Sequence, residues 1–479
     1  MATIDETLVS KVVSEVLLRL QSQNGIAKTG GFSQTQYGVY EKMEDAIEAA
    51  HRSFLKLSEL GFGARKKALA VIRHLCVEKA EEWGKIEFAE TKIGREDHKI
   101  GKLKICGDLV PGIEFLERKA FSGDHGLTII DAAPWGVIGA ITPSTHSVPT
   151  LTGNAINMIA AGNSVVYNTH PGAAKCAAVA IRAYNEAICK ETGISDLLTT
   201  VIKPTLETFD QMVKHPKVAL LCVTGGPAVV KAAMASGKRA VCAGPGNPPV
   251  VVDETADLTN AAQSVIQGAS FDNNLLCIGE KQVFVVASVA DKFIEEMRKA
   301  GAVQLTPAQI EALTKVAFTV TPGQGGGCAH AHAHKDFIGK DAAVLAKAIG
   351  LEVPASTMLL FGETTEEHLF VQEEQMMPFL PIVRMPNADA AIAAAIRTEH
   401  GYRHTGIMHS QNIRNLTKMA QEIDTTLFIK NGPSMTGLGL GGEGFLSFSI
   451  ATPTGEGVTT PMTFTRSRRC VMVESLNMF

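Results

Sequence analysis

Cys277 is one candidate for nucleophilic chemistry in this chain. It ends the segment FDNNLLC (271–277), which follows a stretch of helical character and directly precedes a predicted strand. A reactive thiol needs partial exposure and neighbours that favour the thiolate. The chain contains nine cysteines, so position alone does not distinguish a nucleophile from a buried packing thiol.

A glycine turn follows a predicted strand in VALLCVTGGPAVVKAAM (218–234). Thr224, Gly225 and Gly226 fall between this strand and the start of a helix. Backbone amides at a helix start can bind a phosphate, and glycine lets the ligand approach closely. Many tight turns between a strand and a helix contain glycine, so the motif by itself is a weak indication of a phosphate site.

The segment GLGLGG contains the spacing GxGxxG at Gly437, Gly439 and Gly442. It follows a predicted strand, but FLSFSI after it is not helical and no acidic residue stands at the ribose distance. The dinucleotide fingerprint needs both features. A mobile glycine loop is therefore the preferred interpretation, and a dinucleotide fingerprint is the alternative.

The segment CAHAHAH (328–334) alternates histidine with alanine. In a strand, His330, His332 and His334 would lie on one face, about 6–7 Å apart. Such a row could bind a metal, but no carboxylate or second histidine cluster completes the site nearby. We expect a solvent-facing variable segment here, and no metal is predicted.

The composition indicates a large folded protein. The 479 residues are 45% hydrophobic and 20% charged, and 45 basic against 49 acidic residues give a net charge of −4. No basic excess favours nucleic acid as a partner. No apolar run reaches the roughly 18 residues of a membrane span, and the N-terminus lacks the features of a signal peptide. The scattered cysteines, without CxxC, argue against a disulfide framework or a zinc cluster: Cys76, Cys106, Cys176, Cys189, Cys222, Cys242, Cys277, Cys328 and Cys470.

Alternating strand and helix patterns predict two α/β units. From Pro134, short apolar runs such as GVIGAIT and VALLCV alternate with helical stretches, and a second series runs from PPVVVD (248–253) to TLFIKN. This alternation predicts parallel sheets covered on both faces, which bind ligands beyond the carboxyl ends of their strands. Residues 40–121 are predicted to be helical, and the tail 450–479 is expected to add strands to a partner's sheet.

The N-terminus is predicted to be a short amphipathic helix on a tether. Residues 24–36, NGIAKTGGFSQTQ, are glycine-rich and polar, as in a flexible linker. The helix either docks on its own domain or binds another protein, and it has too few basic residues for a membrane-surface helix. Its apolar face repeats every four residues at Ile4, Leu8, Val12, Val16 and Leu20.

Six segments occur in a fixed order along the chain: APWGVIGAITPST (133–145), NTHPGAAK (168–175), VTGG (223–226), AGPGNPPVVVD (243–253), FDNNLLC (271–277) and EEQMMPFLPIV (373–383). Together these motifs resemble the aldehyde dehydrogenase superfamily, and the resemblance covers about residues 40–479. More narrowly, the chain resembles the CoA-acylating propionaldehyde and acetaldehyde dehydrogenases of bacterial microcompartments. The N-terminal helix and linker match the encapsulation peptide of that branch, and the closing FTRSRRC (464–470) is also similar to it.

The resemblance implies an α/β fold of the aldehyde dehydrogenase type. It combines a Rossmann-type parallel-sheet cofactor domain, an α/β catalytic domain and a small β oligomerisation element. The implied boundaries are 1–23 for the encapsulation helix, 24–36 for the linker, 37–242 for the NAD- and CoA-binding domain (with 119–132 contributing to oligomerisation), 243–449 for the catalytic domain and 450–479 for the oligomerisation segment.

The resemblance also implies roles for individual residues. Cys277 corresponds to the nucleophile and Glu374 to the acid that binds the nicotinamide ribose. The strand end Thr142, Pro143 and Ser144 lines the nicotinamide and ribose, and Thr224, Gly225 and Gly226 form the pyrophosphate turn. The other residues implied for NAD or CoA binding are Thr145, Asn168, His170, Pro171, Gly172, Val229, Ala243 and Gly244.

Three segments of the sequence depart from relatives in the superfamily. Ala243 stands where hydrolytic members carry the Glu that activates water, so attack by water should be slow. CoA needs less activation, because a thiol pKa of about 8.5 leaves some thiolate at neutral pH. Asn168 and the following His170 and Pro171 replace a pattern with the Lys that holds the adenosine ribose in hydrolytic members. His146 stands where relatives carry an oxyanion-donating Asn: either its N–H donates instead, or the Cys277 amide works alone.

These features predict CoA-dependent oxidation of a short aldehyde, propionaldehyde or acetaldehyde, to acyl-CoA through a Cys277 thioester, with NAD as the hydride acceptor. A hydrolytic NAD-dependent dehydrogenase that releases the free acid is the alternative, and an inactive shell-associated protein is a rival of another class. The expected location is the lumen of a bacterial microcompartment, with the N-terminal helix bound to shell or cargo. A homo-oligomer is expected, and neither nucleic acid nor a membrane is expected as a partner.

Overall fold

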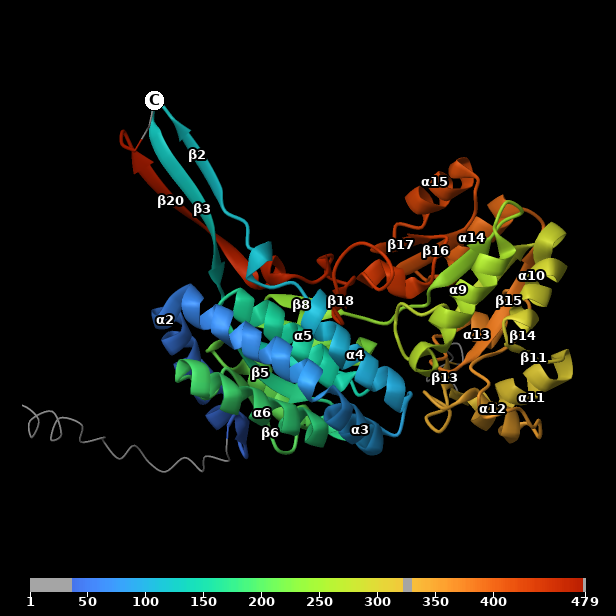
Figure 1. Cartoon of the computed structure of the whole chain (residues 1–479), viewed down its shortest axis with the longest axis horizontal. Coiled ribbons are helices and arrows are strands. Elements are labelled where there is room, and N and C mark those ends of the chain that lie inside the picture. The colour runs from blue at the N-terminus through green and yellow to red at the C-terminus, as the bar shows by residue number, and fades with distance from the viewer. Residues whose placement is uncertain (1–36, 322–329, 477–479) are drawn as a thin grey trace, which may run out of the picture.

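The computed structural model describes residues 37–321 and 330–476. The predicted helix 1–23 and linker 24–36 therefore lie outside the described residues. Two α/β bodies lie side by side, and a long three-stranded arm projects from the first of them (Figure 1). Within the described ranges, no helix is long and apolar enough to cross a membrane.

The first body is built on a six-stranded parallel sheet in the order β1-β6-β5-β4-β7-β8. Every residue of β4 and β5 is buried, because alternate side chains face separate cores. Ile138 and Ala140 pack on one side of the sheet, whereas Val137 and Ile141 pack on the other. The strands are β1 (Val39–Tyr40), β4 (Val137–Thr142), β5 (Ser164–Thr169), β6 (Leu198–Val201), β7 (Val218–Thr224) and β8 (Ala240–Ala243).

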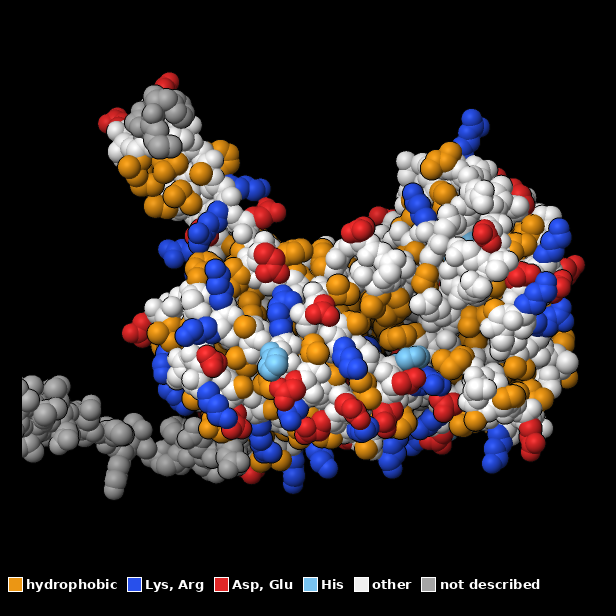
Figure 2. Space-filling view, viewed as in Figure 1, with side chains coloured by type: hydrophobic (Ala, Val, Ile, Leu, Met, Phe, Trp, Pro, Cys, Tyr) orange, Lys and Arg blue, Asp and Glu red, His pale blue; other side chains and the backbone are white. Residues whose placement is uncertain are grey.

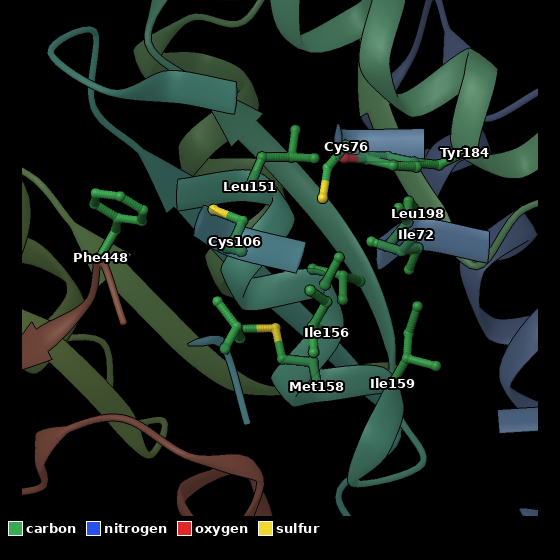
Figure 3. Close-up of a cluster of buried hydrophobic side chains, with 14 of the residues drawn as sticks. Ile72, Cys76, Cys106, Leu151, Ile156, Met158, Ile159, Tyr184, Leu198 and Phe448 are labelled. Atoms are coloured by element: carbon green, nitrogen blue, oxygen red, sulfur yellow. The ribbon is translucent and has the colours of Figure 1, made fainter. Parts of the chain in front are cut away.

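Helices cover both faces of this sheet. The larger core contains α5 (Ser147–Ala160), which is buried along its whole length and packs against Ile72, Cys76 and Tyr184 (Figure 3). The other helices on that side are α2 (Met43–Glu78), α3 (Ala80–Thr91), α4 (Glu96–Leu109) and α6 (Ala174–Thr192), with the short turns η1 (Ile113–Phe115) and η2 (Pro171–Ala173). On the opposite side lie α7 (Leu206–Lys214), α8 (Pro227–Met234) and the first two turns of α2, where Met43 and Ile47 join that core.

The second body is built on a seven-stranded parallel sheet in the order β11-β14-β15-β10-β9-β16-β17. Its central strands are again buried on both faces, which confirms the fold class predicted for the chain. The strands are β9 (Pro249–Val252), β10 (Gln282–Val286), β11 (Val303–Gln304), β14 (Leu360–Glu363), β15 (Phe379–Met385), β16 (Thr405–His409) and β17 (Leu427–Lys430). The helices are α9 (Leu258–Ser270), α10 (Ala287–Lys299), α11 (Pro307–Ala317), α12 (Ala342–Ala348), α13 (Leu369–Gln372), α14 (Ala388–Thr398) and α15 (Ile413–Glu422).

The arm is an antiparallel sheet of β2 (Lys119–Gly123), β3 (Gly126–Pro134) and β20 (Thr465–Val473). The tail was expected to add strands to a partner's sheet, but β20 pairs along the whole of β3 in its own chain, from Thr465 opposite Pro134 to Val473 opposite Gly126. Before it lie the hairpin of β18 (Ile450–Ala451) and β19 (Gly457–Val458) and the turn η6 (Pro461–Phe464).

The histidine row lies in a small two-stranded sheet, and the glycine segment follows β17. β13 (His330–Ala333) pairs with β12 (Phe318–Thr321), and His332 is exposed. Neither His332 nor His334 belongs to a group of described residues close enough to hold a metal ion; the group that does is Glu44, Glu48 and His215. The glycine segment begins in η5 (Ser434–Leu438), and no α-helix follows it in the described residues up to 476, so the context of a dinucleotide fingerprint is missing there.

Candidate active site

A crevice opens at the carboxyl ends of β4, β5 and β7. In the sheet, β4 has β5 on one side and β7 on the other. The chain runs from β4 outward to β5 and β6 and then crosses back to β7, so the strand order changes direction between β4 and β7. Open α/β sheets bind nucleotides at such a point. The crevice encloses about 430 Å³. It is lined by ten of the residues predicted to bind cofactor: Thr142, Pro143, Ser144, Asn168, His170, Pro171, Thr224, Gly225, Gly226 and Val229.

The turn after β7 has the features of a phosphate site. A Cβ atom built on Gly225 or Gly226 would meet nothing within 4 Å, so open space lies over both residues. Gly226 caps the N-terminus of α8, where the helix dipole favours an anion. The buried hydroxyls of Thr142 and Thr169 lack hydrogen-bond partners among the described residues. The site therefore fits a dinucleotide: the two glycines leave space for a phosphate, the start of α8 favours its charge, and two threonine hydroxyls can form hydrogen bonds.

The side chains of two predicted cofactor residues, Asn168 and His170, form hydrogen bonds within the protein. The Asn168 amide donates to the carbonyl of Thr205 at 3.3 Å, and its oxygen accepts the Thr208 hydroxyl at 2.7 Å. The Nδ1 atom of His170 accepts the amide of Gly172 at 3.0 Å. Asn168 thus holds the start of α7 against the crevice and contributes to its wall, while Gly172 does not line the crevice.

Cys277 faces a second cavity, which is continuous with the first. This cavity encloses about 260 Å³ between the two bodies, where the surface is hollowed in Figure 2. It shares Pro143, Thr224, Gly225 and Gly226 with the cofactor crevice. A thiol at Cys277 and a dinucleotide in the crevice would therefore be neighbours. The cavity is also lined by Thr145, His146, Ala243, Gly244, Leu275, Glu374, Met376 and Phe448.

The Cys277 thiol is partly buried and lies in a conflicting electrostatic environment. Burial, together with the carboxylate of Glu374, raises the pKa of the thiol to about 12, whereas the ammonium group of Lys281 acts to lower it. Burial likewise raises the pKa of Glu374, which accepts the backbone amide of Gly246. Lys281 is the charged group that favours the thiolate, and hydrogen bonds from the backbone at Cys277 and Ile278 also lower the thiol pKa.

The segment before Cys277 has an unusual backbone. Asp272, Asn273 and Asn274 have φ angles of 50°, 55° and 62°, so three consecutive residues lie in the left-handed region. Asp and Asn tolerate this region better than other residues that carry a Cβ. Side-chain hydrogen bonds hold the turn: the Asn273 amide donates to the carbonyl of Gly339 at 3.0 Å, and the Asn274 amide donates to the carbonyl of Glu280 at 3.0 Å.

A buried group of four charges joins this turn to the first body. Lys102 contacts Asp272 at 2.5 Å, and Lys99 contacts Glu87 at 3.2 Å, with all four side chains fully buried. Lys99 also donates to the carbonyl of Thr145 at 2.9 Å. Glu87 accepts the first backbone amides of α5, from Ser147 at 3.0 Å and Val148 at 3.2 Å. The ion pairs therefore tie the nucleophile segment to the loop that carries His146.

His146 caps the N-terminus of α5 and faces the same cavity as Cys277. Its ring lies 5.5 Å from the ring of Phe448, and its Nδ1 has no hydrogen-bond partner among the described residues. Burial and the neighbouring charges of Lys102 and Lys99 hold the pKa of His146 well below its ordinary value. A neutral imidazole can donate one hydrogen bond, but it brings no positive charge to the thiol.

Two buried residues near Cys277 carry no signal in the sequence. Lys281 interacts electrostatically with Cys277, and His404 lies behind the same backbone: a Cβ on Gly246 would meet the Cys277 carbonyl oxygen at 2.6 Å and the His404 Cγ at 2.9 Å. Burial lowers the pKa of His404 to about 4, so the ring is neutral at pH 7. His404 lies 127 positions beyond Cys277, so only the folded chain brings them together.

A partly exposed thiol beside a dinucleotide crevice, between two parallel α/β bodies, defines a cysteine-dependent dehydrogenase. The chain belongs to the aldehyde dehydrogenase family, whose sequence profile matches residues 27–443. It is 46% identical over 468 residues to the acetaldehyde dehydrogenase (acetylating) EutE of Salmonella typhimurium, covering 98% of each chain. It is also 40% identical over 473 residues to the propanal dehydrogenase (CoA-propanoylating) of that organism, again over 98% of each.

Solved structures agree with this assignment. The propionaldehyde dehydrogenase of Rhodopseudomonas palustris, solved with bound CoA and an acylated cysteine, is 45% identical, with a TM-score of 0.88 over 92% of this chain and 99% of that one. The propionaldehyde dehydrogenase of the Clostridium phytofermentans fucose utilisation microcompartment is 41% identical, with a TM-score of 0.89 over 93% and 100%. The predicted resemblance to acylating aldehyde dehydrogenases is thus confirmed.

Proposed function

We propose that this chain oxidises a short aldehyde to an acyl-CoA through a thioester on Cys277. The observation that carries the proposal is that Ala243 lines the Cys277 cavity where a hydrolytic enzyme needs a carboxylate. Glu374 is the only carboxylate among the residues that line this described cavity, and it accepts the Gly246 amide. Glu374 is assigned by the resemblance to the nicotinamide ribose, so the described cavity holds no second carboxylate to activate water, whereas the CoA thiol is partly ionised at neutral pH without a base.

The residues of the cavity have separable tasks in this reaction. The Cys277 thiolate attacks the aldehyde carbon, and the resulting oxyanion accepts hydrogen bonds from the Cys277 amide and the neutral His146 ring. NAD, when bound, accepts the hydride that leaves this carbon. The thioester stays on Cys277 until the CoA sulfur attacks it, and Cys277 leaves as the thiolate. Thr142 to Thr145 and Thr224 to Gly226 would hold NAD first and CoA afterwards in one crevice.

The apolar lining of the cavity favours acetaldehyde and propionaldehyde. Leu275, Met376 and Phe448 give its wall an apolar character that suits a short alkyl chain. One methylene group changes binding in such a pocket by only about 1–3 kcal/mol. The relatives named for acetaldehyde and for propanal are similar to this chain at 46% and 40% identity. We therefore expect both aldehydes to be substrates.

Steady-state NADH formation at 340 nm tests the proposal. With NAD and propionaldehyde, continuous turnover should require CoA, and propionyl-CoA should accumulate at the rate of NADH formation. The hydrolytic alternative predicts equal turnover with and without CoA, and propionate as the product. Absence of turnover with NAD or NADP across short aldehydes would instead favour a protein whose role is only to bind a shell.

The N-terminal helix is proposed to place the enzyme in the lumen of a bacterial microcompartment. The support is the apolar stripe and glycine linker of residues 1–36, together with the microcompartment origin of the Clostridium relative. Deletion of residues 1–20 should leave kcat unchanged in solution and abolish co-purification with shell proteins. A truncated protein that no longer folds would show that the helix docks on its own chain.

The arm is proposed to join copies of the chain. Its outer strands are exposed, and Figure 2 shows apolar side chains gathered along it. Phe121, Val471 and Val473 are 59%, 57% and 68% exposed. Contact of such apolar side chains with water is unfavourable, and an exposed sheet edge tends to pair with another chain. Together with residues 119–134, the tail would form the oligomerisation element, and the two α/β bodies would be the cofactor and catalytic domains. Sedimentation that finds a monomer at micromolar concentration would contradict this assembly.

A further inference from the structure

Lys281 is buried directly behind the nucleophile segment without forming an ion pair there. Its side chain is fully buried. Its Nζ donates to the backbone oxygen of Asn274 at 2.7 Å, to the Oδ1 atom of the same residue at 2.6 Å and to the backbone oxygen of Leu276 at 3.2 Å. Both backbone acceptors belong to the segment that ends at Cys277. The side chain therefore links the start of β10 to the turn that presents the thiol.

The acceptors around Lys281 match an ammonium group. A protonated lysine has three N–H donors and no acceptor, and here three oxygen atoms surround the nitrogen. A neutral amine would leave one of these oxygens facing a lone pair. Burial lowers the pKa of Lys281 to about 8, which still leaves the group protonated at pH 7. The site thus keeps a positive charge inside the protein.

Four titratable groups surround this charge. They come from four places in the chain: Cys277 in the nucleophile segment, Glu280 beside Lys281, Glu374 after α13 and His404 before β16. Glu280 is engaged elsewhere, since it accepts the amide and the hydroxyl of Ser434, both at 2.8 Å. His404 is neutral, and Glu374 disfavours the thiolate. None of the other three groups around Lys281 brings a positive charge to Cys277, so Lys281 is the titratable group here that can favour a negative charge on the thiol.

We propose that Lys281 is a positioning residue with two tasks: its hydrogen bonds fix the backbone that presents Cys277, and its charge stabilises the Cys277 thiolate. The inference rests on the proposed role of Cys277 as the nucleophile. It assigns to a buried lysine the activation that His146 cannot supply as a neutral ring. Attack by CoA on the thioester benefits as well, because Cys277 departs as a thiolate.

The test separates the charge from the hydrogen bonds. Lys281→Gln keeps an N–H donor and loses the charge, whereas Lys281→Arg keeps both in a different shape. The pH dependence of Cys277 alkylation by iodoacetamide, followed by peptide mass spectrometry on the enzyme without substrates, reports the apparent thiol pKa. Lys281→Gln should raise this midpoint by about one unit or more, which slows alkylation at pH 7 about tenfold. Lys281→Arg should keep the midpoint within about half a unit of wild type.

Lys238→Gln is the matched control. Lys238 also donates to two backbone oxygens, of His215 at 2.9 Å and of Val218 at 2.7 Å, but it lines neither the Cys277 cavity nor the cofactor crevice. Its replacement should leave the alkylation profile unchanged. An unchanged midpoint in Lys281→Gln, even with a low kcat, would overturn the electrostatic role. If Lys281→Gln does not fold, a raised midpoint in Lys281→Arg, which retains the charge, would overturn it equally.

The alkylation assay is independent of the proposed reaction. If the CoA-dependent activity is absent but the midpoint shifts as expected, the role of Lys281 stands and the proposed function fails. If the activity is present and the midpoint does not move, the proposed function stands and the role of Lys281 fails.

Discussion

Replacement of Cys277 by alanine is expected to lower kcat for CoA-dependent aldehyde oxidation by about 10⁴-fold or more. The reason is that every proposed step forms or breaks a bond to this sulfur, so no remaining group can carry the acyl chain. The fold should be retained, because Cys277 is only partly buried and the loss of one sulfur atom leaves the turn at Asp272 to Asn274 with its hydrogen bonds. NADH formation at 340 nm measures the loss.

Cys189→Ala is the matched control for this prediction. Cys189 is also a free and partly buried thiol, but it lies in α6 outside the cavity. Its replacement should leave kcat within a factor of about two of wild type, as expected for a residue that touches neither substrate nor cofactor. Activity in Cys277→Ala that matches the control would exclude Cys277 as the nucleophile, whatever the product.

Lys102→Met is expected to lower the free energy of unfolding by about 3–5 kcal/mol. It leaves the carboxylate of Asp272 fully buried without its ion pair, and this carboxylate stands at the first left-handed residue of the nucleophile turn. Burial alone would raise the pKa of Asp272, but Lys102 and Lys99 hold it below the ordinary value. Urea unfolding at pH 7 measures the loss.

The pH dependence of this loss follows from the pKa of Asp272. A carboxylate with a lowered pKa in the folded state stabilises the fold above its unfolded pKa, and the stabilisation disappears as the pH falls through the lowered value. The difference between Lys102→Met and wild type should therefore be full at pH 7 and narrow below about pH 4. Lys102→Met combined with Asp272→Asn should be less destabilised than the sum of the single changes. Additive single changes would show that the two side chains do not interact.

The sheets and the cofactor crevice were predictable because their signals are local. GVIGAIT and VALLCV are continuous apolar runs, and such runs occur where a strand is buried on both faces, as β4 and β7 are. Thr142 and Thr224 end these two strands. Ligands of parallel sheets lie beyond the carboxyl ends of the strands, so both residues were expected at one site, and both line the crevice. The role of Asn168 was not predictable, because its partner Thr208 is 40 positions away.

The electrostatics of the site could not be predicted from the sequence. Glu87, Lys99, Lys102 and Asp272 look like ordinary charged residues, and the first three fall in the charge-rich segment predicted to be helical. Their burial depends on the packing of α3 and α4 against the nucleophile turn. Lys281 is equally inconspicuous in the sequence IGEK. The neutral state of His146 was unpredictable for the same reason, since the burial and the neighbouring lysines that lower its pKa arise only on folding.

The central claim is that the acyl group stays bound to Cys277 as a thioester until CoA removes it. The amount of NADH formed in a single turnover without CoA tests this most directly. Enzyme mixed rapidly with NAD and propionaldehyde in the absence of CoA should release one equivalent of NADH for each Cys277 and then stop. Intact-mass spectrometry should find one propionyl group, located on Cys277, and addition of CoA should remove it and restart NADH formation. Continued NADH formation without CoA, with no acyl group on the protein, would contradict the account.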